Sequence, residues 1–400
     1  SYTVSLLQPR IIRDMRLVEN GYRVIERPVS NFLPLPGGDS LTLGGGMART
    51  QVEFSRFSRR DADALPGYYA ALEDAAGLLR DLALRIPPNK GDGLGSIADT
   101  VRQMLPLVRL PVERQSNILD LFTKSASAFL DQWFESDPVK AAFGFDAVVG
   151  NYASPETPGS AYVLLHHVFG EVNGKQGAWG HVVGGMGRIT EIMAQVCRQT
   201  GVDIRTDIPV DQVLVEGGRA TGVRLKGGET LTAPMVIANV GPKLLYDHMI
   251  KASDLPEDFA RRMRGFRTGS GSFRMNVALS GLPRFTARPK PGDHLRAGII
   301  IAPSLAYMDR AYDDARTLGW SRAPIVEMLT PSLVDDSLAP PGHHVASLFC
   351  QQFAPQLPPG ADGTARDWDD EERAAADAII DTVEAHAPGF RKLVLGQMAL

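Results

Sequence analysis

The sequence predicts an α/β fold built from two interleaved parts, and three observations support this. Apolar residues recur every three or four positions over residues 61–150, short alternating runs fill 202–232, and an unbroken apolar run, MVIANV, follows at 235–240. Spacings of three and four indicate amphipathic helices, whereas alternation and short unbroken runs indicate half-buried and fully buried strands. A glycine-hinged stretch, GAWGHVVGGMG, at 177–187 connects the helical part to the strand-rich part.

The individual elements follow from the same periods. Residues 20–45 hold short β-like runs separated by Pro and Gly, which predict a small sheet with hairpin turns. Residues 61–86 predict a helix that Asp61 begins, and 113–134 repeat its pattern. A further helix over 188–199 should end at Gly201, because glycine suits the left-handed C-terminal position. Strands are predicted at 202–206, in a meander with turns at Gly217-Gly218 and Gly227-Gly228, and at 235–240. This order is typical of a doubly wound nucleotide-binding domain interrupted by a β-meander.

Composition excludes several classes of protein. Lys and Arg number 42 against 46 Asp and Glu, so the formal charge of −4 favours neither nucleic acid nor an anionic surface as partner. Two cysteines, Cys197 and Cys350, cannot form a disulfide framework. No export signal and no apolar run of about 20 residues is found. We therefore expect a cytoplasmic or organelle-matrix protein, with peripheral membrane contact and oligomeric state left open.

Several phrases together resemble a known family. These are FESDPVKAAFGFDAVVGNYASPETPGSAYVLLHHVFGE, GAWGHVVGGMGRITEIM, VDIRTDIPVDQVLVEGGRATGVRL, VIANVGP and EMLTPSLVDDSLAPPGHHVASLFCQQFAP. They resemble the phytoene dehydrogenase-related FAD-dependent oxidoreductases, relatives of the carotenoid desaturases and, more distantly, of the flavin amine oxidases. The resemblance implies a partial FAD-binding, glutathione reductase-like domain interleaved with an α+β substrate domain. It assigns 1–50, 180–268 and 375–400 to the FAD-binding domain, 51–179 to the helical part of the substrate domain, and 269–374 to its β-rich part.

One departure from the family pattern affects the cofactor. Members begin with a G-x-G-x-x-G turn that brings the backbone close to a pyrophosphate at a helix N-terminus. Here GGMGRIT has Thr190 where the last glycine is needed, and GDGLGS at 91–96 fails likewise. The family's closing segment is also missing from the sequence. We therefore expect a member that lacks both ends of its FAD-binding domain, binds FAD weakly or not at all, and is inactive as this chain.

The hinge supplies the predicted substrate-site residues. By the resemblance, the hinge passes beside the flavin and the reacting end of the substrate, with Gly185 and Gly187 near the cofactor and Arg188 facing the cavity. Trp179 and His181 could line the flavin's face. The alternatives are a sharp turn between domains, an exposed first-turn Arg188, and aromatic packing at a domain junction.

Other cofactor contacts are expected beyond the hinge. By the resemblance, the backbone of Val210 pairs with adenine, and Ala238, Asn239 and Gly241 permit close approach at the end of the apolar strand. A core strand residue and a turn set by Pro242 are the alternatives. Metal binding is not expected, because the paired histidines 166–167 and 343–344 would point to opposite faces of a strand. Cys197 falls on the apolar stripe of its helix, which favours a core thiol.

The resemblance implies hydride transfer from a C–H bond of a hydrophobic, polyene- or lipid-like substrate to the flavin. No catalytic acid or base is assigned, because the flavin carries that chemistry and the protein positions the substrate. The competing hypothesis is a non-catalytic protein that binds a lipid-like ligand or serves as a scaffold, with a degenerate flavin fold.

Overall fold

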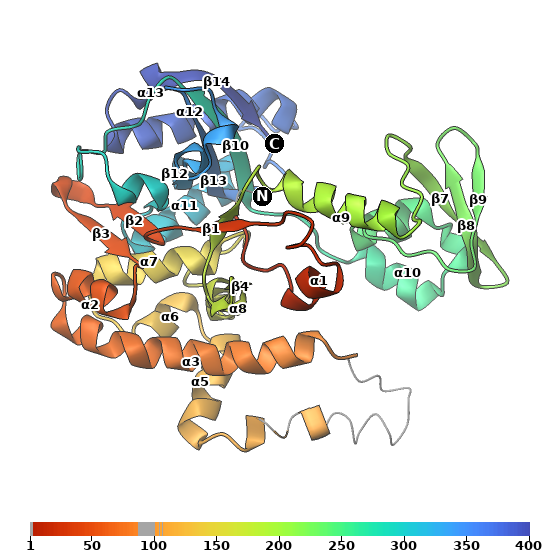
Figure 1. Ribbon diagram of the computed structural model, residues 1–400, viewed down its shortest axis with the longest axis horizontal. Coiled ribbons are helices and arrows are strands. Elements are labelled where there is room, and N and C mark those ends of the chain that lie inside the picture. The colour runs from red at the N-terminus through yellow and green to blue at the C-terminus, as the bar shows by residue number, and fades with distance from the viewer. Residues whose placement is uncertain (1–2, 87–100, 104, 106) are drawn as a thin grey trace. The chain divides into compact units, whose positions relative to one another are not determined.

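The computed structural model describes residues 3–86, 101–103, 105 and 107–400. The predicted match at 91–96 lies outside the described residues. The chain divides into two compact units (Figure 1), of which unit 1 comprises Ser1–Met193 and Ser270–Leu400 and unit 2 comprises Ala194–Gly269. Each unit has its own sheet.

Unit 1 is organised around a mixed sheet of seven strands. The strand order is β14-β10-β13-β12-β11-β2-β3, and every neighbouring pair is antiparallel except β11 and β2. In that order the strands are Val394–Ala399, Ser272–Leu279, His344–Phe353, Trp320–Leu329, Gly298–Ile301, Asn31–Pro34 and Ser40–Leu43. The predicted hairpin region thus supplies the edge of a sheet whose other strands lie more than 200 residues further along the chain.

Helices cover both faces of this sheet. Successive side chains of a strand point to opposite faces, so the strands contribute to two hydrophobic cores, one on each face. On one face, Ile300 and Ile325 pack with a helical layer, whereas Ile299 and Val326 face the other side. The helical layer contains α2 (Met47–Ser55), α3 (Arg59–Ala83), α5 (Val112–Thr123), α6 (Ala126–Leu130), α7 (Asp137–Val148), α8 (His166–Phe169) and α11 (Leu305–Leu318). The opposite face is covered by α12 (Trp368–His386) and α13 (Phe390–Leu393), as Figure 1 shows.

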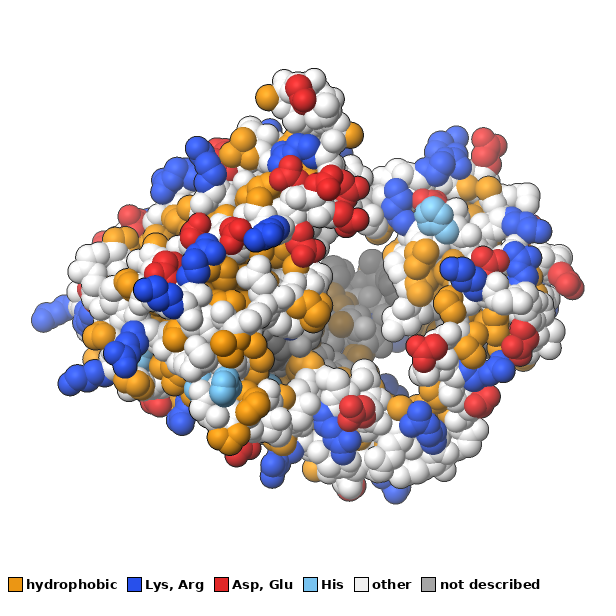
Figure 2. Space-filling model, turned by 90° about the horizontal axis from the view of Figure 1, so that it is seen from above, with side chains coloured by type: hydrophobic (Ala, Val, Ile, Leu, Met, Phe, Trp, Pro, Cys, Tyr) orange, Lys and Arg blue, Asp and Glu red, His pale blue; other side chains and the backbone are white. Residues whose placement is uncertain are grey.

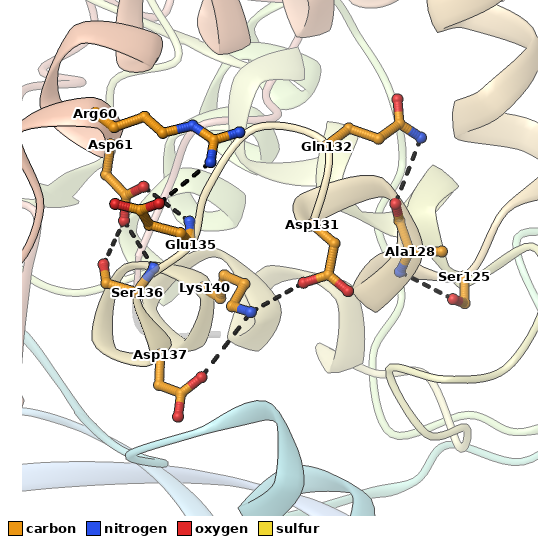
Figure 3. Close-up of polar contacts among 10 residues, drawn as sticks. All are labelled: Arg60, Asp61, Ser125, Ala128, Asp131, Gln132, Glu135, Ser136, Asp137 and Lys140. Atoms are coloured by element: carbon orange, nitrogen blue, oxygen red, sulfur yellow. Dashed lines mark hydrogen bonds and ion pairs between the residues drawn. The ribbon is translucent and has the colours of Figure 1, made fainter.

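The start of α3 also fixes the start of α7. Ser58, not Asp61 as predicted, caps α3, because its hydroxyl accepts a hydrogen bond from the Asp61 amide. The Asp61 carboxylate is fully buried and accepts from the amides of Glu135 (2.8 Å) and Ser136 (3.0 Å) and from the Ser136 hydroxyl (Figure 3). Asp61 therefore satisfies backbone donors just before α7 that would otherwise be buried without acceptors. The predicted second helix is two, α5 and α6, and the break occurs where Ser125 caps α6.

A satellite core lies where the N-terminal segment meets the hinge. The described elements here are α1 (Pro9–Asp14), β1 (Val24–Glu26), β4 (Glu171–Val172), β5 (Lys175–Gln176), β6 (Gly180–Val182) and the beginning of α9 (Gly187–Gln199). β1 pairs antiparallel with β6, and Val4 bridges to Gly180. The helix α9 matches the predicted helix, and Ile189 and Ile192 of its stripe are buried in this core.

Unit 2 contains the predicted meander. Its strands β7 (Val210–Glu216), β8 (Arg219–Leu225) and β9 (Thr230–Thr232) are antiparallel in that order and turn at the two glycine pairs. The remaining elements are a π-helical turn at Leu244–Met249 and the helix α10 (Glu257–Arg264). Gly201 has the expected left-handed conformation, with φ of 86°.

Two predicted strands of unit 2 are wrong. Residues 202–206 and 235–240 belong to no helix or strand and pair with no strand in the described chain. Met235 and Ile237 are 72% and 86% exposed, although an unbroken apolar run predicted full burial. The run signals only that its side chains favour a buried strand, and a strand forms only where a neighbouring backbone accepts its hydrogen bonds.

The assignment of segments to an FAD-binding domain stays a prediction. Residues 375–400, predicted to join 1–50 and 180–268, belong to unit 1, where β14 pairs with β10. Most of the described part of 51–169 is helical.

On the face shown in Figure 2, positively and negatively charged side chains are interspersed. In the described part of the chain, no helix is both long and apolar enough to cross a membrane.

Candidate functional site

A large cavity lies within unit 1, between the sheet and the helical layer. Its volume is about 1010 Å³. Apolar side chains form much of its wall, and they are Val4, Leu6, Leu7, Leu43, Met47, Leu72, Ala142, Phe143, Val149, Leu164, Val168, Met186, Ile189 and Phe349. A cavity of this size with mostly apolar walls and a few polar groups is typical of a small-molecule site.

Charged side chains lie on the sheet side of the cavity. Arg274, Phe349 and Glu327 are cross-strand neighbours on β10, β13 and β12, so they share one face of the sheet. Glu327 Oε1 and Arg27 Nη1 lie 2.7 and 3.4 Å from the position that a Cβ on Gly298 would occupy. A side chain at Gly298 would therefore displace both charged groups. Because glycine has no side chain, both groups have room over β11.

The helix α7 contributes a buried carboxyl group to the opposite wall. Ala142, Phe143, Asp146 and Val149 line the cavity, and spacings of three and four place them on one face of the helix. Asp146 is 8% exposed. Burial, together with the nearby Glu327 carboxylate, raises the pKa of Asp146 well above its ordinary value. The buried site therefore favours the neutral, protonated form of Asp146 over its carboxylate.

A histidine stands beside this carboxyl group. Asp146 Oδ1 and His167 Nδ1 are 3.2 Å apart, but they are not aligned for a hydrogen bond. Burial, then the neighbouring His166 and Arg27, lower the pKa of His167 to about 3. His167 is therefore neutral near pH 7, and its contact with Asp146 is not an ion pair.

Trp179 of the hinge completes this end of the cavity. Its ring centroid lies 5.3 Å from that of His166 and 5.2 Å from that of His167, and its indole N–H donates to the His167 carbonyl at 3.2 Å. Arg80 of α3 donates to the carbonyls of Val168 (2.5 Å) and Phe169 (2.9 Å). These hydrogen bonds fix the short helix α8 and thereby the two imidazole rings.

The hinge itself is tied to the loop after β12. Gly184 donates its amide to Asp335 Oδ2 at 2.6 Å, and Ser337 donates its amide and hydroxyl to Oδ1. Burial acts to raise the pKa of Asp335, but these hydrogen bonds outweigh it and hold the pKa below its ordinary value. His181 Nε2 lies 3.4 Å from the same carboxylate. The left-handed Gly184 thus turns the chain where a carboxylate receives its amide.

Comparisons with known proteins identify the family. The chain is 36% identical to pyridine nucleotide-disulfide oxidoreductase domain-containing protein 2 of Rattus norvegicus, over 99% of this chain and 71% of the rat protein. The chain belongs to the phytoene dehydrogenase-related FAD-dependent oxidoreductases. It is also 32% identical to a zeta-carotene-forming phytoene desaturase of Myxococcus xanthus, over 54% of this chain and 38% of that protein. No model of a known protein family matches the sequence.

Solved structures support the fold. An oxidoreductase from Methanosarcina mazei is similar with a TM-score of 0.60 at 14% identity, over 100% of this chain and 75% of that one. A putrescine oxidase bound to putrescine is similar with a TM-score of 0.54 at 13% identity, over 99% of this chain and 72% of that one. The predicted α/β FAD-binding fold of a phytoene dehydrogenase-related oxidoreductase is thus confirmed.

The hinge residues predicted for this family are not brought together in one place. Trp179 lines the cavity, whereas His181 is buried beside Asp335 and is not part of the lining. Arg188, predicted to face the cavity, is half-exposed on the first turn of α9, 3.1 Å from Glu191. The adjacent Ile189 lines the cavity instead. The roles of these residues toward substrate stay predictions.

The remaining predicted residues fit a flavin cofactor in one respect, which is that their backbone is accessible. Val210 begins β7, which is an edge strand of the meander, so one side of its backbone is open to a flat hydrogen-bonding group. Ala238 and Asn239 are exposed, and no atom lies within 4 Å of a Cβ position on Gly241. Gly187 has equally open surroundings, and Gly185 meets only Leu338, at 3.8 Å. A cofactor of this oxidoreductase family could therefore approach each backbone, and FAD binding by this chain stays a proposal.

Sequence reasoning missed the polar end of the cavity. His166 and His167 were considered only as a metal pair on a strand, but they lie in α8 and both line the cavity. Among the described residues, no group of three or more His, Cys, Asp or Glu side chains is arranged to hold a metal. Asp146 was not singled out, and the available signal was one carboxylate in the apolar stretch 141–149. Such a residue is rarely buried without a role.

Proposed function

We propose that this chain binds a hydrophobic substrate in the unit 1 cavity and presents one of its C–H bonds for hydride transfer to FAD. The observation that carries the proposal is the cavity of about 1010 Å³, with apolar walls formed by the helical layer and the sheet. Family membership supplies the reaction class. The carotenoid desaturases among the relatives favour a dehydrogenase or desaturase reaction.

Within this proposal, the candidate FAD contacts of unit 2 are the backbone of Val210 and the residues Ala238, Asn239 and Gly241. The candidate contacts of unit 1, considered by themselves, are Gly185 and Gly187. FAD, when bound, supplies the hydride-accepting ring, and the protein supplies position and exclusion of water. Phe143 and Leu72 exclude water from the apolar body of the substrate. The polar end at Asp146 and His167 gives the cavity a direction, because it is the part of the wall that would repel a hydrocarbon.

The proposal is tested with purified protein extended by the family's G-x-G-x-x-G unit and closing segment, because this chain alone is expected to bind FAD weakly or not at all. FAD and phytoene dispersed in detergent are added. We expect anaerobic loss of the flavin's visible absorbance when phytoene is added. Met47→Trp, at the start of α2, should slow that reduction at least about tenfold, since Met47 lines the cavity and a larger side chain would fill part of it. Val52→Trp is the matched control, because Val52 lies on the same helix, is 66% exposed and does not line the cavity.

The result also separates the two function classes. Reduction that is equally fast in Met47→Trp and wild type would contradict the assignment of the cavity. Binding of phytoene without any flavin reduction would favour a non-catalytic protein that binds a lipid-like ligand. Peripheral membrane contact stays a proposal, favoured by the exposed apolar side chains of Ile86, Val108, Val112 and Leu119.

A further inference from the structure

The polar end of the cavity contains atoms without hydrogen-bond partners. Within the described chain, Asp146 Oδ1 and His167 Nδ1 are buried and neither has a partner, although both residues line the cavity. His166 Nδ1, next to His167 on α8, is also buried without a hydrogen-bond partner. A buried polar group without a partner costs roughly 1–3 kcal/mol. Buried polar groups in folded proteins are nearly always hydrogen-bonded, so these atoms indicate a ligand.

The protonation states define what that ligand must offer. A protonated carboxyl group provides one O–H donor and retains acceptor capacity, and a neutral imidazole provides one donor and one acceptor. Burial raises the pKa of Asp146 and lowers the pKa of His167, so the site favours the neutral form of both groups. The two therefore match a neutral oxygen group, which accepts a hydrogen bond and in a hydroxyl also donates one. They offer no net charge to attract an ammonium or a carboxylate.

The remaining wall defines the rest of the ligand. Phe143 and Val149 flank Asp146 on its helix, and Leu72 and Leu164 come from neighbouring elements. We propose that the substrate is an apolar molecule with one neutral oxygen group, a hydroxyl or a carbonyl, which Asp146 and His167 bind. This inference rests on the proposed function for the reaction that follows, but not for the binding itself. A pure hydrocarbon such as phytoene would leave these polar atoms without hydrogen bonds, so phytoene tests the reaction class, and the molecule with an oxygen group is the ligand expected to bind more tightly.

A ligand with a carboxylate group is the alternative, and the experiment below tests it. Arg27 and Arg274 also line the cavity, and a carboxylate could pair with them. Glu327 lies near the same point as Arg27 and partly neutralises it. Asp146 Oδ1 and His167 Nδ1 lie 3.2 Å apart but make no hydrogen bond, and burial favours the neutral form of both groups, so the neutral ligand group is the one that the observations favour.

The experiment compares four small probes of equal carbon number: hexan-1-ol, hexan-2-one, hexane and hexanoate. Each displaces a fluorescent apolar dye, 1-aminoanthracene, from the purified chain without added flavin. We expect the alcohol and the ketone to bind more tightly than hexane and hexanoate. Asp146→Leu should weaken the alcohol about tenfold and leave hexane unchanged, because it removes the hydrogen bond and keeps the volume.

Two further variants make the result specific. Asp146→Asn should retain the preference for the alcohol, because the amide also donates and accepts while remaining neutral. Asp137→Leu is the matched control on the same helix, since its side chain is 78% exposed and outside the cavity lining, and it should change nothing. Loss of the preference in both Asp146→Asn and Asp146→Leu would contradict the neutral role.

The remaining outcomes overturn the inference in distinguishable ways. Tighter binding of hexanoate than of hexan-1-ol would assign the cavity to an anionic group at Arg27 and Arg274. Equal binding of hexane and hexan-1-ol would show that the polar end binds no substrate group. Displacement by none of the probes would contradict both this inference and the proposed substrate cavity. Because no flavin is used, a failure of flavin reduction leaves a positive result here intact.

Discussion

Asp61 connects two helices through a single buried carboxylate (Figure 3). We expect Asp61→Ala to lower the free energy of unfolding by about 3 kcal/mol, because the amides of Glu135 and Ser136 and one hydroxyl lose their buried acceptor. Urea denaturation followed by circular dichroism measures the change. Asp63→Ala on the same helix is the control, since Asp63 is exposed and should change stability by less than about 0.5 kcal/mol. Equal effects of the two substitutions would contradict the anchoring role of Asp61.

His167 should make stability depend on pH on the acidic side. Its pKa is about 3 in the folded protein, against an ordinary value of 6.5, so the unfolded chain binds a proton first as the pH falls. The stability that His167 contributes is therefore fully present above about pH 6.5 and is lost as the pH falls toward 3. The slope in that window is at most about 1.4 kcal/mol per pH unit.

The measurement compares wild type with His167→Gln by urea denaturation at several pH values between 6.5 and 4. The free energy of unfolding should fall less steeply in the variant, because glutamine takes up no proton. His166, Asp146 and Arg27 surround the ring and remain in both proteins. Parallel curves for the two proteins would show that His167 titrates alike in the folded and unfolded chain.

Asp146 illustrates what sequence could not provide at this scale. A lone carboxylate in an apolar helix is visible in the sequence, but its neighbour His167 lies 21 positions away and Glu327 a further 160. Their proximity depends on packing of α7 and α8 over the sheet. Trp179, in the glycine hinge, lines the cavity, and its predicted place beside the substrate stays a prediction.

Nine of the twelve residues of α7 are buried, and glycine permits that packing. A Cβ on Gly144 would lie 2.2 Å from Leu305 Cδ2 of α11. We expect Gly144→Ala to lower the free energy of unfolding by about 1 kcal/mol, since the overpacking outweighs the better helix propensity of alanine. Gly77→Ala in α3 is the matched substitution, because no atom lies within 4 Å of its Cβ position. It should raise stability by about 0.5–1 kcal/mol.

Thermal denaturation of the two glycine variants checks the sign of each effect. If both raise the melting temperature, α7 and α11 have room to separate and the contact does not limit the packing. If both lower it, helix propensity at Gly77 is not the deciding property.

Elements with local signals were predicted well. The helix at 187–199 has its stripe and its terminal glycine within its own sequence, and the meander has its glycine turns. Residues 202–206 and 235–240 were predicted as strands and are not, because pairing depends on a backbone elsewhere. The strand order of the seven-stranded sheet joins β2 to β11 across the chain, and no periodicity specifies such a pairing.

At the scale of the whole molecule, unit 1 has two cores on opposite faces of one sheet. The division predicted from the sequence followed changes of period, whereas the compact units follow contacts, so β14 joins β10 despite the 114 positions between Leu279 and Val394. The family resemblance predicted the fold class correctly, because long ordered phrases carry more information than any single period. Which segments serve the cofactor stays a prediction.

Unit 2 provides a prediction about solution behaviour. Replacing Ile237 with lysine should lower the tendency of the chain to self-associate, because Met235, Ile237 and Val240 are exposed on a segment that pairs with no described strand. Sedimentation velocity over a range of concentrations measures the effect. Val202→Lys, at another exposed apolar position of unit 2, is the comparison. A sedimentation coefficient independent of concentration in wild type would contradict the expectation.

The stretch MVIANV also has a consequence for handling and storage. Six consecutive residues without a charge or a proline, outside any described strand, have the composition of a segment that seeds cross-β aggregates. In most globular proteins such a stretch reaches solvent only after unfolding, whereas here it is exposed in the folded chain. Precipitation of this protein should therefore begin from its native state and accelerate with concentration below its melting temperature, so dilution and cold will preserve it better than added stabilisers of the fold.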